Sequence, residues 1–103
     1  MILEIAMLKV NAGQEPAFEA AMTKAAPVIA GSPGYRAHQL QRCVETPGRY
    51  MLLVQWETIE AHTVGFRQSP AFGEWRQIIG SYFAEPPVVE HYERVLQWGG
   101  PQS

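Results

Sequence analysis

Two segments of this chain are apolar on both of the faces that a β-strand would present. In residues 50–56 (YMLLVQW), apolar side chains occupy even and odd positions alike, and residues 2–10 (ILEIAMLKV) show the same pattern. Alternate side chains of a strand point to opposite faces of its sheet. Helices of the same chain can cover one face, but a soluble monomer rarely leaves the other apolar face exposed. The pattern therefore predicts a homodimer in which a second copy covers the open face.

Short turn motifs separate these apolar segments and set the order of the elements. Asn11–Gly13, Thr46–Arg49 and Pro86–Pro87 have turn or helix-breaking composition. Pro16 and the pair Ser69-Pro70 stand where helices begin, and apolar residues follow each at helical spacing. We predict strands at 2–10, 35–44, 50–56 and 88–95, a helix from Pro16 to Ile29, and helical segments at 58–68 and 70–82.

The resulting order, β-α-β-β-α-β, is that of the ferredoxin-like α+β fold. In this fold a four-stranded antiparallel sheet carries its helices on one face. The chain has 103 residues, 47% of them hydrophobic, which suits a single core. We expect one domain over residues 1–95, with its second helical region broken in two, and a C-terminal tail over residues 96–103.

Composition argues against several partners. Eight basic residues face ten acidic ones, with no run of Lys or Arg to follow a phosphate backbone, so nucleic acid is not an expected partner. The longest hydrophobic run, Tyr50 to Val54, is far shorter than the roughly 20 residues that span a membrane. No secretory signal is recognisable at the N-terminus, so we expect a cytoplasmic protein. The sequence has no Gly-rich phosphate loop or nucleotide fingerprint, and we expect no cofactor.

Residues 33–95 resemble the antibiotic biosynthesis monooxygenase (ABM) family. The family belongs to the dimeric α/β-barrel superfamily, which also contains heme-degrading and quinol-oxidising branches. The resemblance implies a dimer of ferredoxin-like protomers, often with strand or tail exchange at the last strand, and a cavity between sheet and helices. It is carried by Pro33-Gly34-Tyr35, Gln55-Trp56-Glu57, Ala61-His62, Ser69-Pro70-Ala71-Phe72, and Pro87 leading into Val89-Glu90-His91-Tyr92-Glu93.

The segment QWETIEAHTVGF is similar to the cofactor-free monooxygenases that oxidise aromatic polyketides. In those enzymes a Trp, an Asn, a Tyr and an Arg line the pocket. Trp56 and Arg76 stand at the Trp and Arg positions, whereas Leu52 replaces the Asn and His62 replaces the Tyr. In the heme-degrading branch, the heme-ligating histidine falls at about Arg76. The resemblance therefore implies no specific heme binding.

Three residues are the candidate catalytic set. His62 can take a proton from a phenolic substrate, because imidazole titrates near neutrality. Trp56 can stack on a ring, and Arg76 can neutralise an anion. The alternatives are a polar helix residue for His62, a core anchor for Trp56, and a surface ion pair with Glu74 for Arg76.

The candidate substrate-binding residues are apolar. An aromatic stripe at helical spacing can line a pocket, although such stripes more often form core. Three histidines, His38, His62 and His91, lie on separate predicted elements without a short-range ligand pair, so we expect no metal site. The candidate lining residues are Leu52, Phe66, Phe72 and Trp75.

Three functions remain open. The first is a cofactor-independent monooxygenase that acts on a small aromatic, quinol or polyketide-like substrate. The second is a non-catalytic dimeric α/β-barrel that binds a small ligand or serves in stress. The third is a structural dimer whose cavity is filled by its own side chains.

Overall fold

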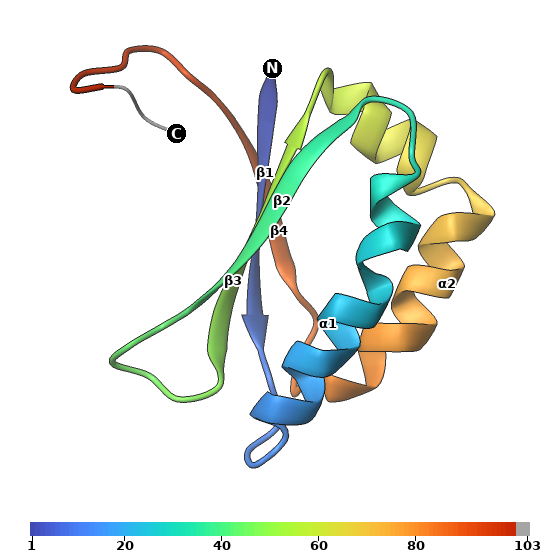
Figure 1. Cartoon of the computed structure of the whole chain (residues 1–103), viewed down its shortest axis with the longest axis vertical. Helices are drawn as coiled ribbons and strands as arrows, with labels where there is room; N and C mark the ends of the chain where they lie inside the picture. Colours follow the sequence, from blue (N-terminus) through green and yellow to red (C-terminus); the bar gives the residue numbers. More distant parts are fainter. Residues whose placement is uncertain (101–103) are drawn as a thin grey trace.

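A computed structural model describes residues 1–100 of the chain. Its sheet has four antiparallel strands in the order β2-β3-β1-β4, and both long helices lie on one face (Figure 1). This arrangement confirms the predicted ferredoxin-like α+β fold. The elements are β1 (Ile2–Lys9), α1 (Glu15–Ala30), β2 (Tyr35–Arg42), β3 (Arg49–Trp56), the π-helix η1 (Ala61–Phe66), α2 (Pro70–Ile79), the 3₁₀-helix η2 (Gly80–Tyr82) and β4 (Val88–Glu93).

Strand register explains where the strands end. β1 lies between β3 and β4, and Ile2 pairs with Trp56 on one side and with Glu93 on the other. β4 stops at Glu93, two residues before the predicted end, where its pairing with the first residue of β1 ends. β2 ends at Arg42 instead of Val44, since the loop closes there with a hydrogen bond from the Cys43 N–H to the Arg49 carbonyl (2.8 Å).

The core lies between the sheet and the helices. α1 buries Phe18, Met22, Ala25 and Ile29, whose spacing of three and four residues gives one apolar stripe. α2 buries Trp75 and Ile79 in the same way. The sheet contributes the inward-facing side chains of its two central strands: Ala6, Leu8, Tyr50, Leu52, Val54 and Trp56.

The second helical region is broken, as predicted. Only a six-residue π-helix, η1, forms in its first part, and Ser69 then adopts an extended backbone before Pro70 opens α2. Proline is favoured in the first turn of a helix because its missing N–H has no partner there anyway. The break allows η1 to place two side chains, His62 and Phe66, against the sheet independently of α2.

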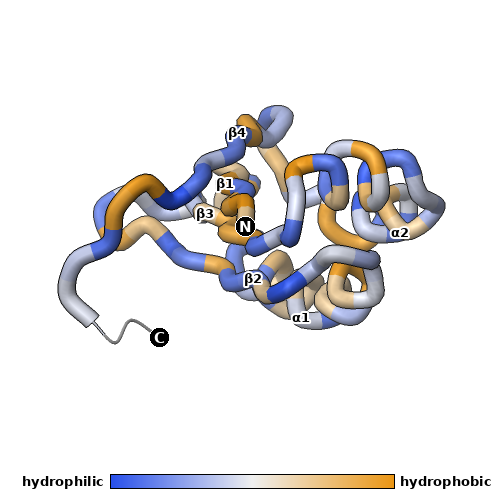
Figure 2. Tube along the Cα trace, turned by 90° about the horizontal axis from the view of Figure 1, so that it is seen from above, coloured by the Kyte–Doolittle hydropathy of each residue, from blue (hydrophilic) through white to orange (hydrophobic). Residues whose placement is uncertain are grey.

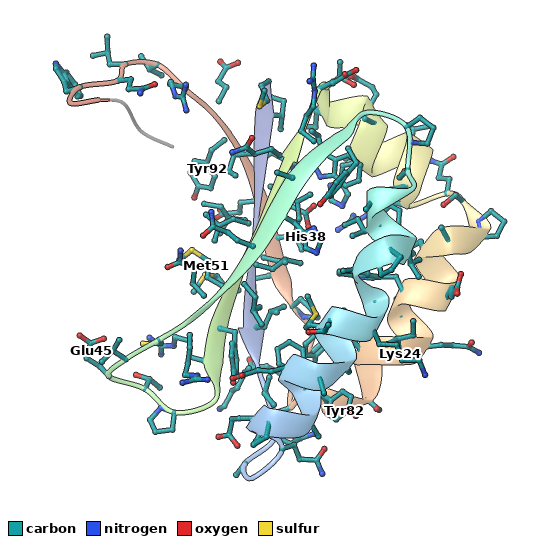
Figure 3. The ribbon with its side chains drawn as sticks, viewed as in Figure 1. Lys24, His38, Glu45, Met51, Tyr82 and Tyr92 are labelled. Carbon is teal, nitrogen blue, oxygen red and sulfur yellow. The ribbon has the colours of Figure 1, made fainter. Side chains whose placement is uncertain are left out.

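The other face of the sheet carries no helix. Met51 and Tyr92 point away from the helices, whereas His38 lies on the helix side (Figure 3). The C-terminal tail leaves β4 on the side opposite the helices, as the view from above shows (Figure 2). It carries exposed apolar side chains, including Trp98, which is 77% exposed. No helix in the described part of the chain is long and apolar enough to cross a membrane.

Candidate functional site

A cavity of about 540 Å³ lies between the helix-covered face of the sheet and α2. Strand β1 contributes one wall, η1 and α2 contribute another, and the segment that leads into β4 closes one end. Most of its lining is apolar or aromatic, which suits a small ring compound. The lining residues are Glu4, Ala6, Leu8, Ile29, Leu52, His62, Phe66, Arg67, Phe72, Trp75, Arg76, Ile79, Gly80, Phe83, Ala84, Glu85, Pro86, Pro87 and Val89.

The cavity brings together most of the residues that the sequence singled out. Trp56 is the exception, because it is fully buried behind the lining. Its ring stacks on the imidazole of His62, with centroids 5.3 Å apart and planes 19° apart. The candidates that line the cavity are Leu52, His62, Phe66, Phe72, Trp75 and Arg76.

A buried polar cluster forms one part of the cavity wall. Glu4 is 5% exposed and His62 is 3% exposed, and they are the two buried polar or charged residues of the described chain. The Trp56 indole N–H donates to Glu4 Oε1 (3.0 Å), and His62 Nε2 lies 3.3 Å from the same oxygen. On its other side, His62 Nδ1 lies 2.8 Å from His91 Nε2.

Strand register and η1 assemble this cluster. Glu4 pairs with Val54 on β3 and with His91 on β4, so the side chains of all three residues share the helix-covered face. Trp56 lies two residues beyond Val54 on that face, within reach of Glu4. The π-helix then places His62 over Glu4 and Trp56.

Burial moves the pKa values of the two buried groups in opposite directions. Desolvation raises the pKa of the Glu4 carboxyl, against the lowering effects of the Trp56 hydrogen bond and of Arg67. Desolvation, with smaller effects of Arg67 and His91, lowers the pKa of His62 to about 4. His62 is therefore neutral at pH 7, and its Nε2, which lies 3.3 Å from Glu4 Oε1, belongs to an uncharged imidazole.

Glu4 has one free oxygen at the cavity. Oε1 is the atom that contacts both Trp56 and His62, and no partner is recorded for Oε2. Within residues 1–100, every fully buried side-chain nitrogen or oxygen has a partner, so Oε2 keeps accessible surface. Because Glu4 lines the cavity, a bound molecule can reach that surface.

Two arginines lie at the exposed side of the cavity. Arg76 makes no ion pair with Glu74 in the described structure, and its guanidinium instead lies 5.8 Å from the centroid of the Phe72 ring. Arg67 acts electrostatically on Glu4, His62 and His91. Both arginines can therefore stabilise negative charge that develops in the cavity.

Sequence reasoning missed Glu4 and Arg67 as site residues, and it did not include His91 among the candidate site residues. A usable signal was present for Glu4, because an acidic residue shares its strand face with Ala6 and Leu8. His38 lies apart from the cluster and contacts the ring of Trp75 at 6.5 Å between centroids. In residues 1–100 no three histidine, cysteine or acidic side chains converge to hold a metal ion.

Comparison with known proteins places the chain in a family. Residues 1–78 match the family model described as antibiotic biosynthesis monooxygenase. A relative from Bacillus subtilis (strain 168), named "Uncharacterized protein YczJ", is 44% identical over 95 residues, which are 92% of this chain and 100% of the relative.

Two solved structures share the fold. One is a "Putative antibiotic biosynthesis monooxygenase" from Bordetella bronchiseptica, with a TM-score of 0.90, 46% identity, and coverage of 92% of this chain and 97% of the other. The second is the heme-degrader MhuD of Mycobacterium tuberculosis with two hemes bound in its active site. It has a TM-score of 0.77, 27% identity, and coverage of 96% and 100%.

Proposed function

This chain belongs to the antibiotic biosynthesis monooxygenase family, and we propose that it is a cofactor-independent monooxygenase for a small aromatic, quinol or polyketide-like ring. Family membership supports a monooxygenase or small-ligand-binding role, and the substrate is our inference. One observation carries the proposal: a buried carboxylate, Glu4, has a free oxygen in a cavity with aromatic walls.

The cavity walls suit a flat ring. Leu52, Phe66, Phe72 and Trp75 contribute apolar and aromatic surface, and a volume of about 540 Å³ is within the range of small-ligand sites. Excluding water from such a site strengthens the electrostatic effect of Glu4 and of the two arginines on a bound ring.

Glu4 is the base in the proposed reaction. Its Oε2 takes a proton from a ring hydroxyl or an activated ring CH₂, and its raised pKa makes the carboxylate a stronger base. His62 lies between the two groups, with Nε2 3.3 Å from Glu4 Oε1 and Nδ1 2.8 Å from His91 Nε2, and we assign it the role of positioning Glu4. Trp56 has the same role through its N–H.

The deprotonated ring then reacts with O₂. For a ring CH₂, one oxygen atom becomes the ring carbonyl and the other leaves as water with the two ring hydrogens, so O₂ is the only oxidant. Arg67 and Arg76 stabilise the anion that forms before oxygen adds.

Oxygen consumption with hydroquinones and anthrone-like compounds tests this assignment. Glu4→Gln keeps the size of the side chain but removes the base, and we expect turnover to fall by roughly 10²- to 10⁴-fold. Glu74→Gln is the matched control, because it makes the same chemical change on an exposed residue of α2. Parent-like turnover in Glu4→Gln would show that Glu4 is not the base.

A ligand-binding role without turnover is the second candidate. Leu52 in the cavity wall offers no hydrogen bond to an anionic intermediate, where the polyketide monooxygenases have an amide. Thermal stabilisation by the same ring compounds without oxygen consumption would favour this role. If no compound shifts the melting temperature, the structural-dimer hypothesis is favoured.

Heme is not the ligand that we propose. His62 is the one histidine among the described lining residues; its Nδ1 is hydrogen-bonded with His91 and its Nε2 lies beside Glu4. Titration with heme tests this statement, and we expect that no stoichiometric Soret band forms.

We also propose that the chain works as a homodimer, with a second copy on the open face of the sheet. Leu3, Ile5 and Leu53 are half-buried there, and Met7, Val88 and Tyr92 are exposed. These strand residues form one apolar surface opposite the helices. A second copy related by two-fold symmetry would cover this surface and remove it from water.

A further inference from the structure

His91 pairs with Glu4 across β4 and β1 and its ring contacts His62, but the reaction described above does not use it. His91 lies on β4, which pairs only with β1 and therefore forms an edge of the sheet. Its side chain is half-buried, whereas Glu4 and His62 are buried. The three residues thus form a line from the cavity to the edge of the sheet.

We propose that His62 and His91 form a proton relay that connects Glu4 with solvent at the β4 edge. This inference rests on the proposed role of Glu4 as the base. The proton that Glu4 takes from a substrate must leave before the next turnover, and the relay gives it a route that does not pass through the cavity.

The distances support continuous transfer. Glu4 Oε1 lies 3.3 Å from His62 Nε2, and His62 Nδ1 lies 2.8 Å from His91 Nε2. Each imidazole can accept a proton on one nitrogen and release one from the other. Trp56, the other partner of Glu4, only donates through its indole N–H and cannot pass a proton on.

Two hydrogen-bond arrangements exist, and they differ by one proton. With Glu4 ionised, His62 Nε2–H donates to Glu4 and His91 Nε2–H donates to His62 Nδ1. In the second, a half-turn of the protonated carboxyl group has brought the proton taken on the substrate side round to His62. The acid then donates to His62 Nε2, His62 Nδ1–H donates to His91 Nε2, and His91 carries its proton on Nδ1. Moving each proton one step outward converts the second arrangement into the first and releases one proton to solvent.

The surrounding charges favour neutral histidines in the relay. Arg67 faces all three groups, and its positive charge opposes a lasting imidazolium at His62 or His91. Glu93 lies two residues beyond His91 on the same strand face and is exposed. A proton therefore passes through the relay without resting on it.

Two variants of His91 separate a relay from a structural contact. His91→Gln can still donate to His62 Nδ1 but cannot transfer a proton, whereas His91→Leu removes both abilities. We expect kcat to fall by about tenfold or more in both variants, with KM little changed. Because imidazole buffer can carry the proton in place of His91, we expect added imidazole to raise the kcat of both variants. His38→Gln is the matched control, because His38 is a half-buried strand histidine outside the cluster. Parent-like kcat in His91→Gln would overturn the relay.

A second measurement does not depend on turnover. ¹⁵N chemical shifts report which nitrogen of each histidine carries the proton. In the ligand-free protein, we expect His62 and His91 to exchange tautomers together at one midpoint as Glu4 is protonated. If the tautomers of His62 and His91 changed at different midpoints, the relay would be overturned even in an active enzyme. Absence of turnover in the parent, with coupled tautomers, would overturn the proposed oxidation alone.

Discussion

His62 and Glu4 are ionisable groups in a region that water barely reaches, and this has consequences for stability. The unfolded chain binds a proton on His62 near pH 6.5, whereas the folded chain binds it only at about pH 4. Stability therefore falls as the pH is lowered through this interval, and the loss reaches its full value of about 3 kcal/mol only below pH 4, where His62 is protonated in the folded chain as well. His38 and His91, whose pKa values burial also lowers, contribute in the same direction.

Glu4 has the opposite effect. Its pKa is raised in the folded protein, so the folded state binds this proton at a higher pH than the unfolded state does. Stability therefore rises as the pH falls from the folded pKa of Glu4 to its unfolded pKa. We predict that His62→Gln flattens or reverses the loss of stability between pH 6.5 and pH 4. Urea unfolding at several pH values measures this slope. An equal slope in parent and variant would contradict the lowered pKa of His62.

The position of η1 depends on a close contact at the start of β2. Gly34 has a φ of +87°, and a Cβ built there would lie 2.6 Å from the Cβ of Ala61, the residue before His62. Only glycine satisfies both conditions without strain. The contact brings η1 close to the sheet, which is what allows His62 to reach Glu4.

A double-mutant cycle tests this contact. Gly34→Ala combines backbone strain of about 1–2 kcal/mol with the clash against Ala61. In an Ala61→Gly background we expect only the strain to remain. Gly13→Ala is the matched control, because Gly13 has a φ of +81° and no atom within 4 Å of its Cβ position. Urea unfolding measures the free energy of unfolding of Gly34→Ala, Ala61→Gly, the double variant and Gly13→Ala. An equal loss on Gly34→Ala in both backgrounds would exclude the contact.

At the scale of the whole molecule, the open sheet face is the surface that we propose as the dimer interface. Leu53 pairs with Ile5 at the centre of that face. Leu53→Lys would place a charge in the proposed dimer interface at a cost of several kcal/mol, so we predict a monomer. Val64→Lys is the control, since Val64 is a half-exposed residue of η1. Sedimentation equilibrium distinguishes the two states, and a folded parent that is monomeric at micromolar concentration would refute the dimer.

The element order, the strand faces and the break before α2 followed from the sequence alone. Each of these features depends on local information. Proline and glycine interrupt elements wherever they occur, and a repeat of two or of three to four residues shows which face of an element is apolar. For the same reason, the helical spacing of Phe72 and Trp75 in α2 was readable from the sequence.

The polar cluster was decided only by the tertiary structure. Glu4, Trp56, His62 and His91 come from β1, β3, η1 and β4, and strand register and the placement of η1 determine which atoms meet. A sequence pattern shows that Glu4 faces inward, but not that His91 lies opposite it. Register and packing arise from the free energy of the whole core, which no single segment contains, and they place both Glu4 and His62 in the wall of the cavity.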